Sequence, residues 1–273
     1  MEVSRSRYYQ YLERKKQWYT KEEAILLNEV KALDELSNHS YGSRQMSKNL
    51  KAKGYSIGRY AARTLMRKAD IVCVQRRRFK ITTTNSNHSF RIAENKLDRQ
   101  FKVDAPDKVW VTDISYLWTY EGWLYIAAIL DLFSRRIVGW AMENHMRSEL
   151  IKKALDMALG RRTPEIGLMH HSDRGVQYAR DSYQNRLKAA NIVISMSRKG
   201  NCYDNAVIER FWGSLKSERT NGKVYLTQEE AKADVIDYIE MFYNSKRLHS
   251  TLNYVSPLQF ENEFRLKKVS TFT

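Results

Sequence analysis

The sequence predicts an α/β fold preceded by a small, basic, all-helical domain. Three apolar runs of strand length follow one another at residues 109–117, 123–131 and 136–142, as expected for strands covered on both faces. From residue 148 onward, short apolar stretches alternate with stretches of helical spacing, which is typical of a sheet with flanking helices. We therefore expect helices over residues 1–74, a basic and polar linker over 75–104, and the α/β domain over 105–273.

The charge distribution predicts a polyanionic partner. The formal net charge is +16 over 273 residues. Residues 1–100 hold 22 Lys and Arg against 10 Asp and Glu, a net +12, whereas residues 101–273 hold 25 against 21, a net +4. Lys and Arg that neutralise phosphates release counterions and drive binding, so we expect double-stranded DNA as the partner, gripped mainly by the first hundred residues.

Several protein classes are disfavoured by composition. Cys73 and Cys202 are far apart and form no CxxC pair, which argues against a structural zinc site and a disulfide framework. The N-terminus lacks an apolar signal segment, and the most apolar stretch, residues 124–132, is too short to cross a bilayer. We expect a cytoplasmic, nucleoid-associated protein that does not bind membranes.

Four helices are expected in the first 74 residues. Residues 4–18 suit a short basic helix, and residues 20–36 suit a longer one in which Thr20 and Glu23 form a capping box. Two further helices, at 43–53 and 56–69, should be joined by a turn at Gly54, an arrangement typical of a helix-turn-helix.

The second helix of this pair should meet DNA. It places Arg59, Arg63 and Arg67 at successive spacings of four residues, opposite the apolar residues Ala62, Leu65 and Met66. We predict that the three arginines bind DNA; the alternative is a basic helical hairpin that contacts no bases. Past this helix, Arg76, Arg77 and Arg78 open the linker and are expected to follow a phosphate backbone, unless the linker is only a solvated tether.

The order of elements after residue 105 predicts the sheet. Three strands in a meander should precede a helix at 148–159, a strand at 166–170, a helix at 178–190, a strand at 193–196, and helices at 204–219 and 228–243. This order matches a ribonuclease-H-like mixed five-stranded sheet with flanking helices. Asp113 then lies on the first strand, Asp173 follows the fourth, and Glu209 lies on the helix after the fifth. Strand ends are where α/β folds place their sites.

These three carboxylates, on separate elements of a very basic chain, predict a metal site that acts on a polyanion. Mg²⁺ and Mn²⁺ prefer oxygen ligands, and two such ions can hold both oxygens of an in-line phosphoryl displacement. We predict that Asp113, Asp173 and Glu209 are catalytic and bind two Mg²⁺ ions, for which Mn²⁺ can substitute. Asp131, also within an apolar run, is the main alternative to Asp113, although a turn before Ser134 suits it better.

Basic residues near this site are candidate phosphate ligands. Lys216 follows Glu209 by two helical turns at nearly the same azimuth, about 10 Å further along. A surface ion pair is the alternative, but residues seven apart pair poorly within a helix. Arg198 and Lys199 lie in a loop that we expect to be mobile and to bind DNA.

The adjacent histidines His170 and His171 should point to opposite faces of their strand, so they cannot easily share one ion. We expect one of them to pack in the strand and the other to line the site. Metal ligation by either histidine is the less favoured alternative.

Seven segments carry a resemblance to a known family. They are residues 109–114 (VWVTDI), 122–125 (GWLY), 131–140 (DLFSRRIVGW), 171–178 (HSDRGVQY), 195–209, 243–249 (YNSKRLH) and 256–257 (SP). Together they resemble the OrfB-type transposases of bacterial insertion sequences, whose catalytic core is similar to that of retroviral integrases. The resemblance covers nearly the whole chain.

The resemblance implies a DNA transposase that cuts at the ends of an insertion sequence and transfers strands through attack by a 3′-hydroxyl. It implies that Asp113, Asp173 and Glu209 are the acidic triad of a DDE recombinase and that Lys216 is the basic residue that follows it. Arg247 and His249 match the C-terminal motif of the family. We predict that both bind DNA; bracing of the catalytic helix is the alternative.

The resemblance also implies partners. Transposases of this kind usually act as multimers on DNA, so we expect a homo-oligomer. In this family an upstream helix-turn-helix and leucine zipper, encoded in a separate reading frame, usually join this portion, and none precedes Met1 here. We therefore expect an upstream partner protein. Two other hypotheses are a catalytically incomplete DNA-binding regulator and a ribonuclease-H-type nuclease, the latter disfavoured by the arginines of the first hundred residues.

Overall fold

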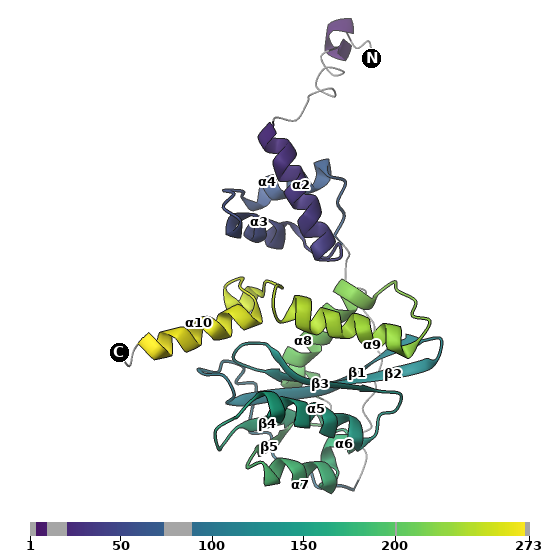
Figure 1. Ribbon diagram of the computed structural model, residues 1–273, viewed down its shortest axis with the longest axis vertical. Helices are drawn as coiled ribbons and strands as arrows, with labels where there is room; N and C mark the ends of the chain where they lie inside the picture. The colour runs from purple at the N-terminus through teal and green to yellow at the C-terminus, as the bar shows by residue number, and fades with distance from the viewer. Residues whose placement is uncertain (1–3, 10–20, 74–88, 200, 271–273) are drawn as a thin grey trace. The chain divides into compact units, whose positions relative to one another are not determined.

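The computed structural model describes residues 4–9, 21–73, 89–199 and 201–270 and divides the chain into two compact units, Met1–Val74 and Gln75–Thr273 (Figure 1). Residues 5–9 are helical, in agreement with the start of the first expected helix. The expected capping residue Thr20 and the linker arginines Arg76, Arg77 and Arg78 lie outside the described residues.

Besides residues 5–9, the described part of the first unit contains the helices α2 (Lys21–Leu36), α3 (Ser43–Ala52) and α4 (Arg59–Lys68). Their apolar faces enclose a small core. Gly54 has φ +93°, a conformation that costs glycine little, and so makes the expected turn after α3. Helix α4 begins three residues later than predicted. Residues 55–58 before it are not helical, and the Ser47 hydroxyl donates to the Ile57 carbonyl at 2.7 Å. The core residues are Leu27, Val30, Leu33, Tyr41, Met46, Leu50, Ala62, Leu65 and Met66.

A five-stranded mixed sheet forms the centre of the second unit, as predicted. Its strand order is β3-β2-β1-β4-β5. The first three strands form the antiparallel meander, and β4 and β5 add to β1 in parallel. Their bounds are β1 Val109–Thr119, β2 Gly122–Asp131, β3 Ile137–Glu143, β4 Met169–Ser172 and β5 Val193–Met196.

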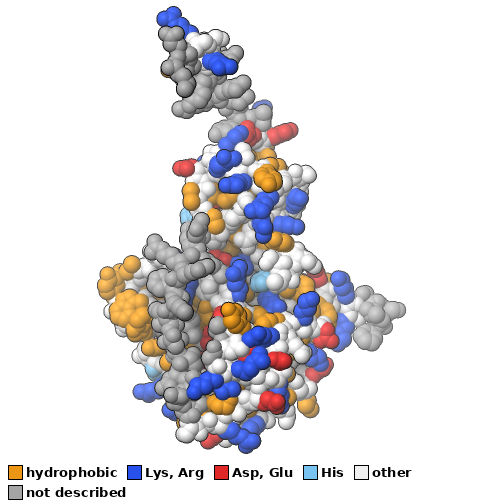
Figure 2. Space-filling view, turned by 180° about the vertical axis from the view of Figure 1, so that it is seen from behind, with side chains coloured by type: hydrophobic (Ala, Val, Ile, Leu, Met, Phe, Trp, Pro, Cys, Tyr) orange, Lys and Arg blue, Asp and Glu red, His pale blue; other side chains and the backbone are white. Residues whose placement is uncertain are grey.

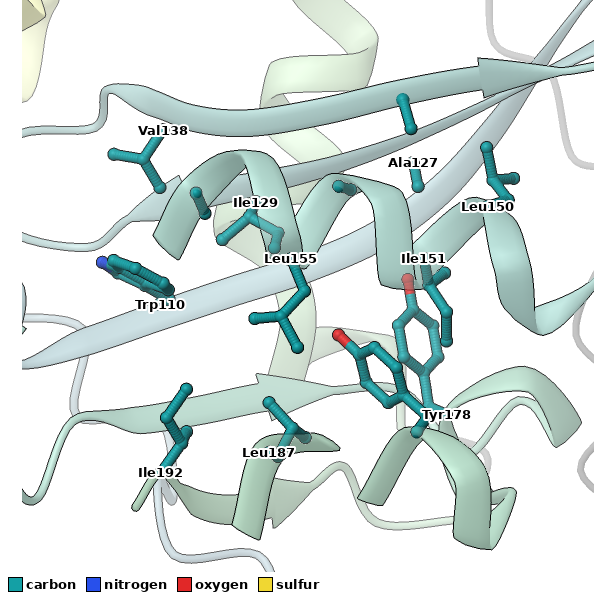
Figure 3. Close-up of a cluster of buried hydrophobic side chains, with 14 of the residues drawn as sticks. Trp110, Ala127, Ile129, Val138, Leu150, Ile151, Leu155, Tyr178, Leu187 and Ile192 are labelled. Atoms are coloured by element: carbon teal, nitrogen blue, oxygen red, sulfur yellow. The ribbon is translucent and has the colours of Figure 1, made fainter. Parts of the chain in front are cut away.

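Helices cover both faces of this sheet (Figure 1). One face carries α5 (Ser148–Arg161), α6 (Val176–Ala179) and α7 (Asp181–Ala189), and the other carries α8 (Ala206–Leu215) and α9 (Gln228–Ile236). The core on the α5 side contains the fully buried Trp110, Leu150 and Leu155, with Tyr178 and Leu187 beside them (Figure 3). Burial of such side chains supplies most of the free energy of folding, so this face holds β1 rigidly in place.

Four elements of the second unit differ from the prediction by more than two residues, in continuity or in helix type. The fourth strand begins at Met169, since Gly167 at φ +98° makes a turn inside the predicted range 166–170. The helix expected at 178–190 is divided into α6 and α7 at Arg180, whose backbone is extended. Those expected at 204–219 and 228–243 end in π-helical turns, η2 (Lys216–Thr220) and η3 (Asp237–Tyr243). A C-terminal helix, α10 (Pro257–Ser270), was not predicted.

Part of the predicted linker 75–104 lies on the sheet unit. Met196 at the end of β5 donates its N–H to the Glu94 carbonyl at 3.3 Å, and the Lys96 N–H donates to Ser195 Oγ at 2.9 Å. Gln184 on α7 donates to the Arg91 carbonyl at 3.1 Å. The edge strand β5 would otherwise expose unpaired backbone groups, and this segment covers it. In the described residues we find no helix with the length and apolar character needed to span a membrane.

Gly139 on β3 lies close to α5, so its substitution tests the packing of the sheet against this helix. A Cβ at this position would lie 2.3 Å from the Ala154 carbonyl oxygen and 2.8 Å from Ala158 Cβ. Because both neighbours are held by the helix, Gly139→Ala should lower the free energy of unfolding by about 1–3 kcal/mol. Urea unfolding of the full chain measures the change.

Gly160, near the end of the same helix, provides the matched control because a Cβ there meets nothing within 4 Å. Gly160→Ala should be neutral or stabilising by up to about 1 kcal/mol, since alanine favours helix. Equal stability of the Gly139→Ala variant and the wild type would contradict the close approach of β3 and α5.

Candidate active site

The parallel pairing of β1 and β4 brings two acidic residues side by side at the C-terminal end of β4. Val109 pairs with Met169 and Val111 with His171. The same register, continued by two residues, places Asp113 opposite Asp173, just beyond the end of β4. Asp113 itself is held within β1, where its antiparallel partner on β2 is Ala128.

The helix α8 brings the third carboxylate. Asn205, directly before the helix, donates its side-chain amide to the Thr112 carbonyl at 3.1 Å, and Trp212 donates its indole N–H to Asp113 Oδ2 at 3.1 Å. Glu209 lies four residues after Asn205 and three before Trp212, so all three share one helix face. That face is turned toward β1 at Asp113.

The three carboxyl groups interact electrostatically. Burial raises the pKa of Asp113 well above its usual range, and the charges of Asp173 and Glu209 raise it further. The pKa of Glu209 is also raised, by burial and then by the charge of Asp173. Two neighbouring acids whose pKa values rise together are typical of carboxylates that share a site.

Asp173 is oriented by a turn that follows β4. The Gly175 N–H donates to Asp173 Oδ1 at 2.8 Å. A Cβ on Gly175 would lie only 3.0 Å from that oxygen, so glycine leaves room for the carboxylate to fold back on the turn. The donors from Gly175 to Asp173 and from Trp212 to Asp113 are both neutral, and they orient these carboxylates without cancelling their charge.

The donor set suits a hard divalent cation in its chemistry, since it consists of carboxylate oxygens whose charges repel one another. In their present positions, however, no three His, Cys, Asp or Glu side chains among the described residues are arranged to hold a metal ion. The carboxylates are thus gathered but are not drawn together as closely as a shared ion requires.

Lys216 lies beside this cluster. Its Nζ is 5.2 Å from the centre of the Tyr116 ring, and burial lowers its pKa, an effect partly offset by the charge of Asp113. Although α8 ends at Leu215 and a π-helical turn follows, Lys216 therefore stays within electrostatic reach of Asp113.

The loop before α8 is tied down by Asp204. This fully buried carboxylate accepts hydrogen bonds from the Arg198 backbone N–H at 2.9 Å and Nε at 3.1 Å, and from Arg99 Nε at 3.0 Å. These partners, Arg198 foremost, hold the pKa of Asp204 far below its usual range. The expectation of a mobile loop is therefore wrong at Arg198, although its side chain and that of Lys199 stay largely exposed.

Both strand histidines are buried on opposite faces, and neither lines the carboxylate cluster, contrary to the expectation for one of them. His170 hydrogen-bonds the Tyr183 hydroxyl at 3.1 Å, and His171 lies between the hydroxyls of Ser195 and Ser197, at 2.9 and 3.1 Å. Burial lowers the pKa of His170 to about 3 and that of His171 to about 4, so both are neutral and structural.

Asp131, the alternative to Asp113, accepts hydrogen bonds that give it a structural role. Its side chain is fully buried and accepts from the Ser134 N–H and hydroxyl, at 2.8 and 2.9 Å, and from the Asp107 N–H at 2.7 Å. It closes the turn after β2, as expected for a residue before Ser134.

Arg247 is buried and braces the two π-helical turns. It donates from Nε and Nη2 to the two carboxylate oxygens of Glu218 on η2, each at 2.6 Å, and the Tyr238 hydroxyl of η3 donates to the same carboxylate at 2.7 Å. With 9% of its surface exposed, Arg247 favours the alternative of bracing over DNA contact. The nearby His249 hydrogen-bonds Thr251, and burial and the Arg247 charge lower its pKa to about 3.

The arginines of the first unit lie where their spacing predicted. Arg59, Arg63 and Arg67 are all exposed on α4, while Ala62 and Leu65 on the opposite face are buried. Arg59 Nε lies 3.5 Å from Ser43 Oγ. Their contact with DNA stays a prediction.

Sequence reasoning missed Trp212, Asn205 and Asp204, which position the cluster. Trp212 could have been found, because it follows Glu209 by three residues and thus shares its helix face. The polar pair Asp204-Asn205 directly before an apolar helix also suggested a helix start, but its partners on β1 and near residue 99 are remote in sequence.

The chain is similar to known proteins along most of its length. Models described as an integrase core domain match residues 103–202 and 209–264, and a model of an HTH-like domain matches residues 21–79. The chain is 40% identical over 262 residues to an uncharacterized 31 kDa protein of insertion element IS600 from Shigella sonnei, with 96% of each protein covered. It is 39% identical over 227 residues to the transposase InsF for insertion sequence IS3A from Escherichia coli, with 83% of this chain and 78% of that protein covered.

Among solved structures, the catalytic core domain of HTLV-2 integrase in complex with magnesium matches at 15% identity with a TM-score of 0.40, covering 57% of this chain and 96% of that one.

The pair formed by Arg247 and Glu218 generates a stability prediction. Arg247→Met should lower the free energy of unfolding by about 3–5 kcal/mol, because it leaves a buried carboxylate without its cation. The double variant Arg247→Met with Glu218→Leu should recover much of this loss. Urea unfolding measures both. If Arg247→Met weakened DNA binding at unchanged stability, the bracing role would be wrong.

The raised pKa of Asp113 generates a pH prediction for the metal-free protein. A carboxyl with a raised pKa binds protons more tightly when folded, so its contribution to stability falls as pH rises through its unfolded-state pKa toward the folded one. Asp113→Asn removes this loss and should raise the melting temperature near neutral pH by about 2–4 °C.

The same variant should show a smaller decline in stability between mildly acidic and neutral pH than the wild type. Thermal unfolding in chelator-treated buffers measures both slopes, with Asp104→Asn, a change at an exposed surface carboxylate, as the control. Equal slopes for Asp113→Asn and the wild type would show that folding does not raise the pKa of Asp113.

Proposed function

We propose a specific use of the carboxylate cluster in this chain, which belongs to the OrfB-type DDE transposases of bacterial insertion sequences, metal-dependent enzymes with an integrase core. In this proposal Asp113, Asp173 and Glu209 hold two Mg²⁺ ions, with Mn²⁺ as a substitute. When bound, the ions stabilise the attacking and leaving oxygens of a phosphoryl transfer. The assignment is carried by the register of β1 and β4, which sets Asp113 opposite Asp173, and by the Trp212–Asp113 hydrogen bond, which brings the Glu209 face of α8 to the same place.

The chain supplies no covalent nucleophile in this reaction. Water first cleaves a phosphodiester at the end of the element and frees a 3′-hydroxyl, and that hydroxyl then attacks a second phosphodiester, so that one bond forms as another breaks. Trp212 and the Gly175 N–H orient the carboxylates of Asp113 and Asp173. Asn205 fixes the start of α8 to β1 and thereby sets the position of Glu209.

DNA contacts in the proposal come from both units. The exposed Arg59, Arg63 and Arg67 of α4 are the DNA-binding residues of the first unit. In the second unit, Lys216 is placed for a phosphate beside the carboxylates, because it is a cation within reach of Asp113, and Arg198 and Lys199 border the loop before α8. His249 is a weaker candidate, since its lowered pKa keeps it neutral.

Joining an element end to other DNA requires two DNA segments at one site, so we also propose a homo-oligomer on DNA in the cytoplasm. An upstream-frame partner that supplies further end recognition belongs to the same proposal. The hypotheses of a non-catalytic regulator and of a ribonuclease-H-type nuclease are not favoured, because the matched domains are integrase cores and the named relative is a transposase.

Substitution of the acids tests the proposal. Asp113→Asn, Asp173→Asn and Glu209→Gln should each lower DNA cleavage and strand transfer at least about a thousandfold, since loss of metal stabilisation of the transferring phosphoryl group raises the barrier by several kcal/mol. Oligonucleotide cleavage and joining assays, with the upstream partner added where required, measure the loss.

Two controls accompany this test. Glu229→Gln removes a carboxylate that is 81% exposed and should leave activity unchanged. Binding of each variant to duplex DNA should match the wild type. Full strand transfer by any one of the three variants would overturn the assignment of the triad.

A further inference from the structure

A ladder of aromatic side chains extends along the β1–β2 hairpin beyond Asp113. Tyr116 pairs with Tyr125 and Trp118 with Trp123. The ring centroids are 4.9 Å apart for Trp118 and Trp123 and 5.0 Å apart for Tyr116 and Trp123, both edge to face. The four rings thus form a continuous surface that starts three residues, about 10 Å along the strand, from Asp113 and on the opposite face of β1. Lys216 links the two, since it lies over the Tyr116 ring and within electrostatic reach of Asp113.

The outer part of this ladder is exposed. Trp118 and Trp123 have 57% and 44% of their surface accessible, and Tyr120 at the hairpin turn has 72%. Figure 2 shows hydrophobic side chains gathered at the left of the second unit, where the ends of β1 and β2 lie in the reversed view of Figure 1. An exposed cluster of aromatic side chains often marks a binding surface, because water solvates apolar groups poorly.

A pocket of about 320 Å³ lies against the same rings. It is lined by Tyr116 and Trp118 on β1, by Lys216, and by the loop that carries Lys223. The Lys216 ammonium lies over the Tyr116 ring, and Lys223 pairs with Asp234 at 2.8 Å. A purely apolar partner would leave Lys216 desolvated, whereas a ligand that combines a flat ring with an anionic group suits both the rings and the cation.

We propose that this aromatic ladder, formed by Tyr116, Trp118, Trp123 and Tyr125, binds an unpaired nucleotide of the DNA strand that enters the carboxylate cluster. Its base stacks on Trp118, and its phosphate lies at Lys216. Aromatic side chains bind bases of any sequence in this way, because every base has a π-face. The inference rests on the proposed function, since it needs a DNA strand at Asp113.

The ladder should make the site prefer DNA ends with unpaired bases over fully paired ends, a preference that the carboxylates alone do not provide. A duplex end whose last bases are unpaired can place one base on Trp118, whereas a fully paired end must first open. The chain should therefore bind DNA with a few unpaired 3′ nucleotides more tightly than the same duplex with a blunt end.

The test compares Trp118→Ala with Trp118→Phe in the full chain without divalent ions, so that no cleavage occurs. Binding to the frayed and the blunt oligonucleotide is measured by fluorescence anisotropy. Trp118→Ala should weaken binding to the frayed DNA about tenfold and leave binding to blunt DNA unchanged, while Trp118→Phe keeps most of the preference. A 2-aminopurine in the unpaired position should be quenched by the wild type and not by Trp118→Ala.

Ile166→Ala, which removes a side chain that is 88% exposed on another loop, is the matched control and should change neither measurement. Equal losses on frayed and blunt DNA, or unchanged quenching in Trp118→Ala, would overturn the proposal. A change of oligomeric state in Trp118→Ala with an intact preference for frayed DNA would overturn it too, by identifying the ladder as a contact between copies of the chain.

The failure of this proposal can be told apart from failure of the catalytic assignment. The Trp118 measurements need no bound metal and no turnover, whereas the triad is tested by strand transfer in Asp113→Asn. A wild-type preference for frayed DNA that disappears in Trp118→Ala, together with active Asp113→Asn, would retain the stacking site and reject the triad. Loss of strand transfer in Asp113→Asn with no Trp118 effect would do the reverse.

Discussion

The parallel register between β1 and β4 is the constraint on which the site depends. It places Asp113 and Asp173 at adjacent positions where β4 ends and β1 continues, paired with β2. A shift of one residue would turn one side chain to the opposite face of the sheet and separate the two acids. The buried core between the sheet and α5 stabilises this register, so the packing of one face determines the chemistry of the other.

This arrangement costs stability, and the surrounding residues limit that cost. Burial of Asp113, together with the charges of Asp173 and Glu209, raises its pKa and so opposes folding near neutral pH. Trp212 and Gly175 bond the carboxylates without neutralising them, which fixes their orientation and preserves their affinity for a cation. Neighbouring positions that require charge balance have it: Asp204, fully buried, is paired with Arg198 and Arg99. Asp204 is thus balanced by arginines, whereas the bond from Trp212 leaves the charge of Asp113 in place beside Asp173 and Glu209.

Much of this fold could be predicted from the sequence because its signals are local. The strand runs, the helix spacing and the turn at Gly54 depend on neighbours within a few residues, and the five-stranded sheet followed from them. The division at Arg180, the π-helical turns and α10 could not be predicted in the same way, because tertiary contacts decide them. The three acids lie on the elements expected, but the partners that orient them come from distant segments.

The role of a basic residue is the hardest part to predict, since sequence does not distinguish a cation that faces DNA from one that faces a buried acid. Arg247 lies in a polar motif that suggested DNA contact, yet its guanidinium is bonded to Glu218. Arg162 is similarly paired with the buried Glu261 at 2.6 and 2.7 Å. A paired, buried arginine contributes little to the field outside the protein. The exposed arginines of α4 have no such buried acid beside them on their helix face, so they are the clearer candidates for DNA contact.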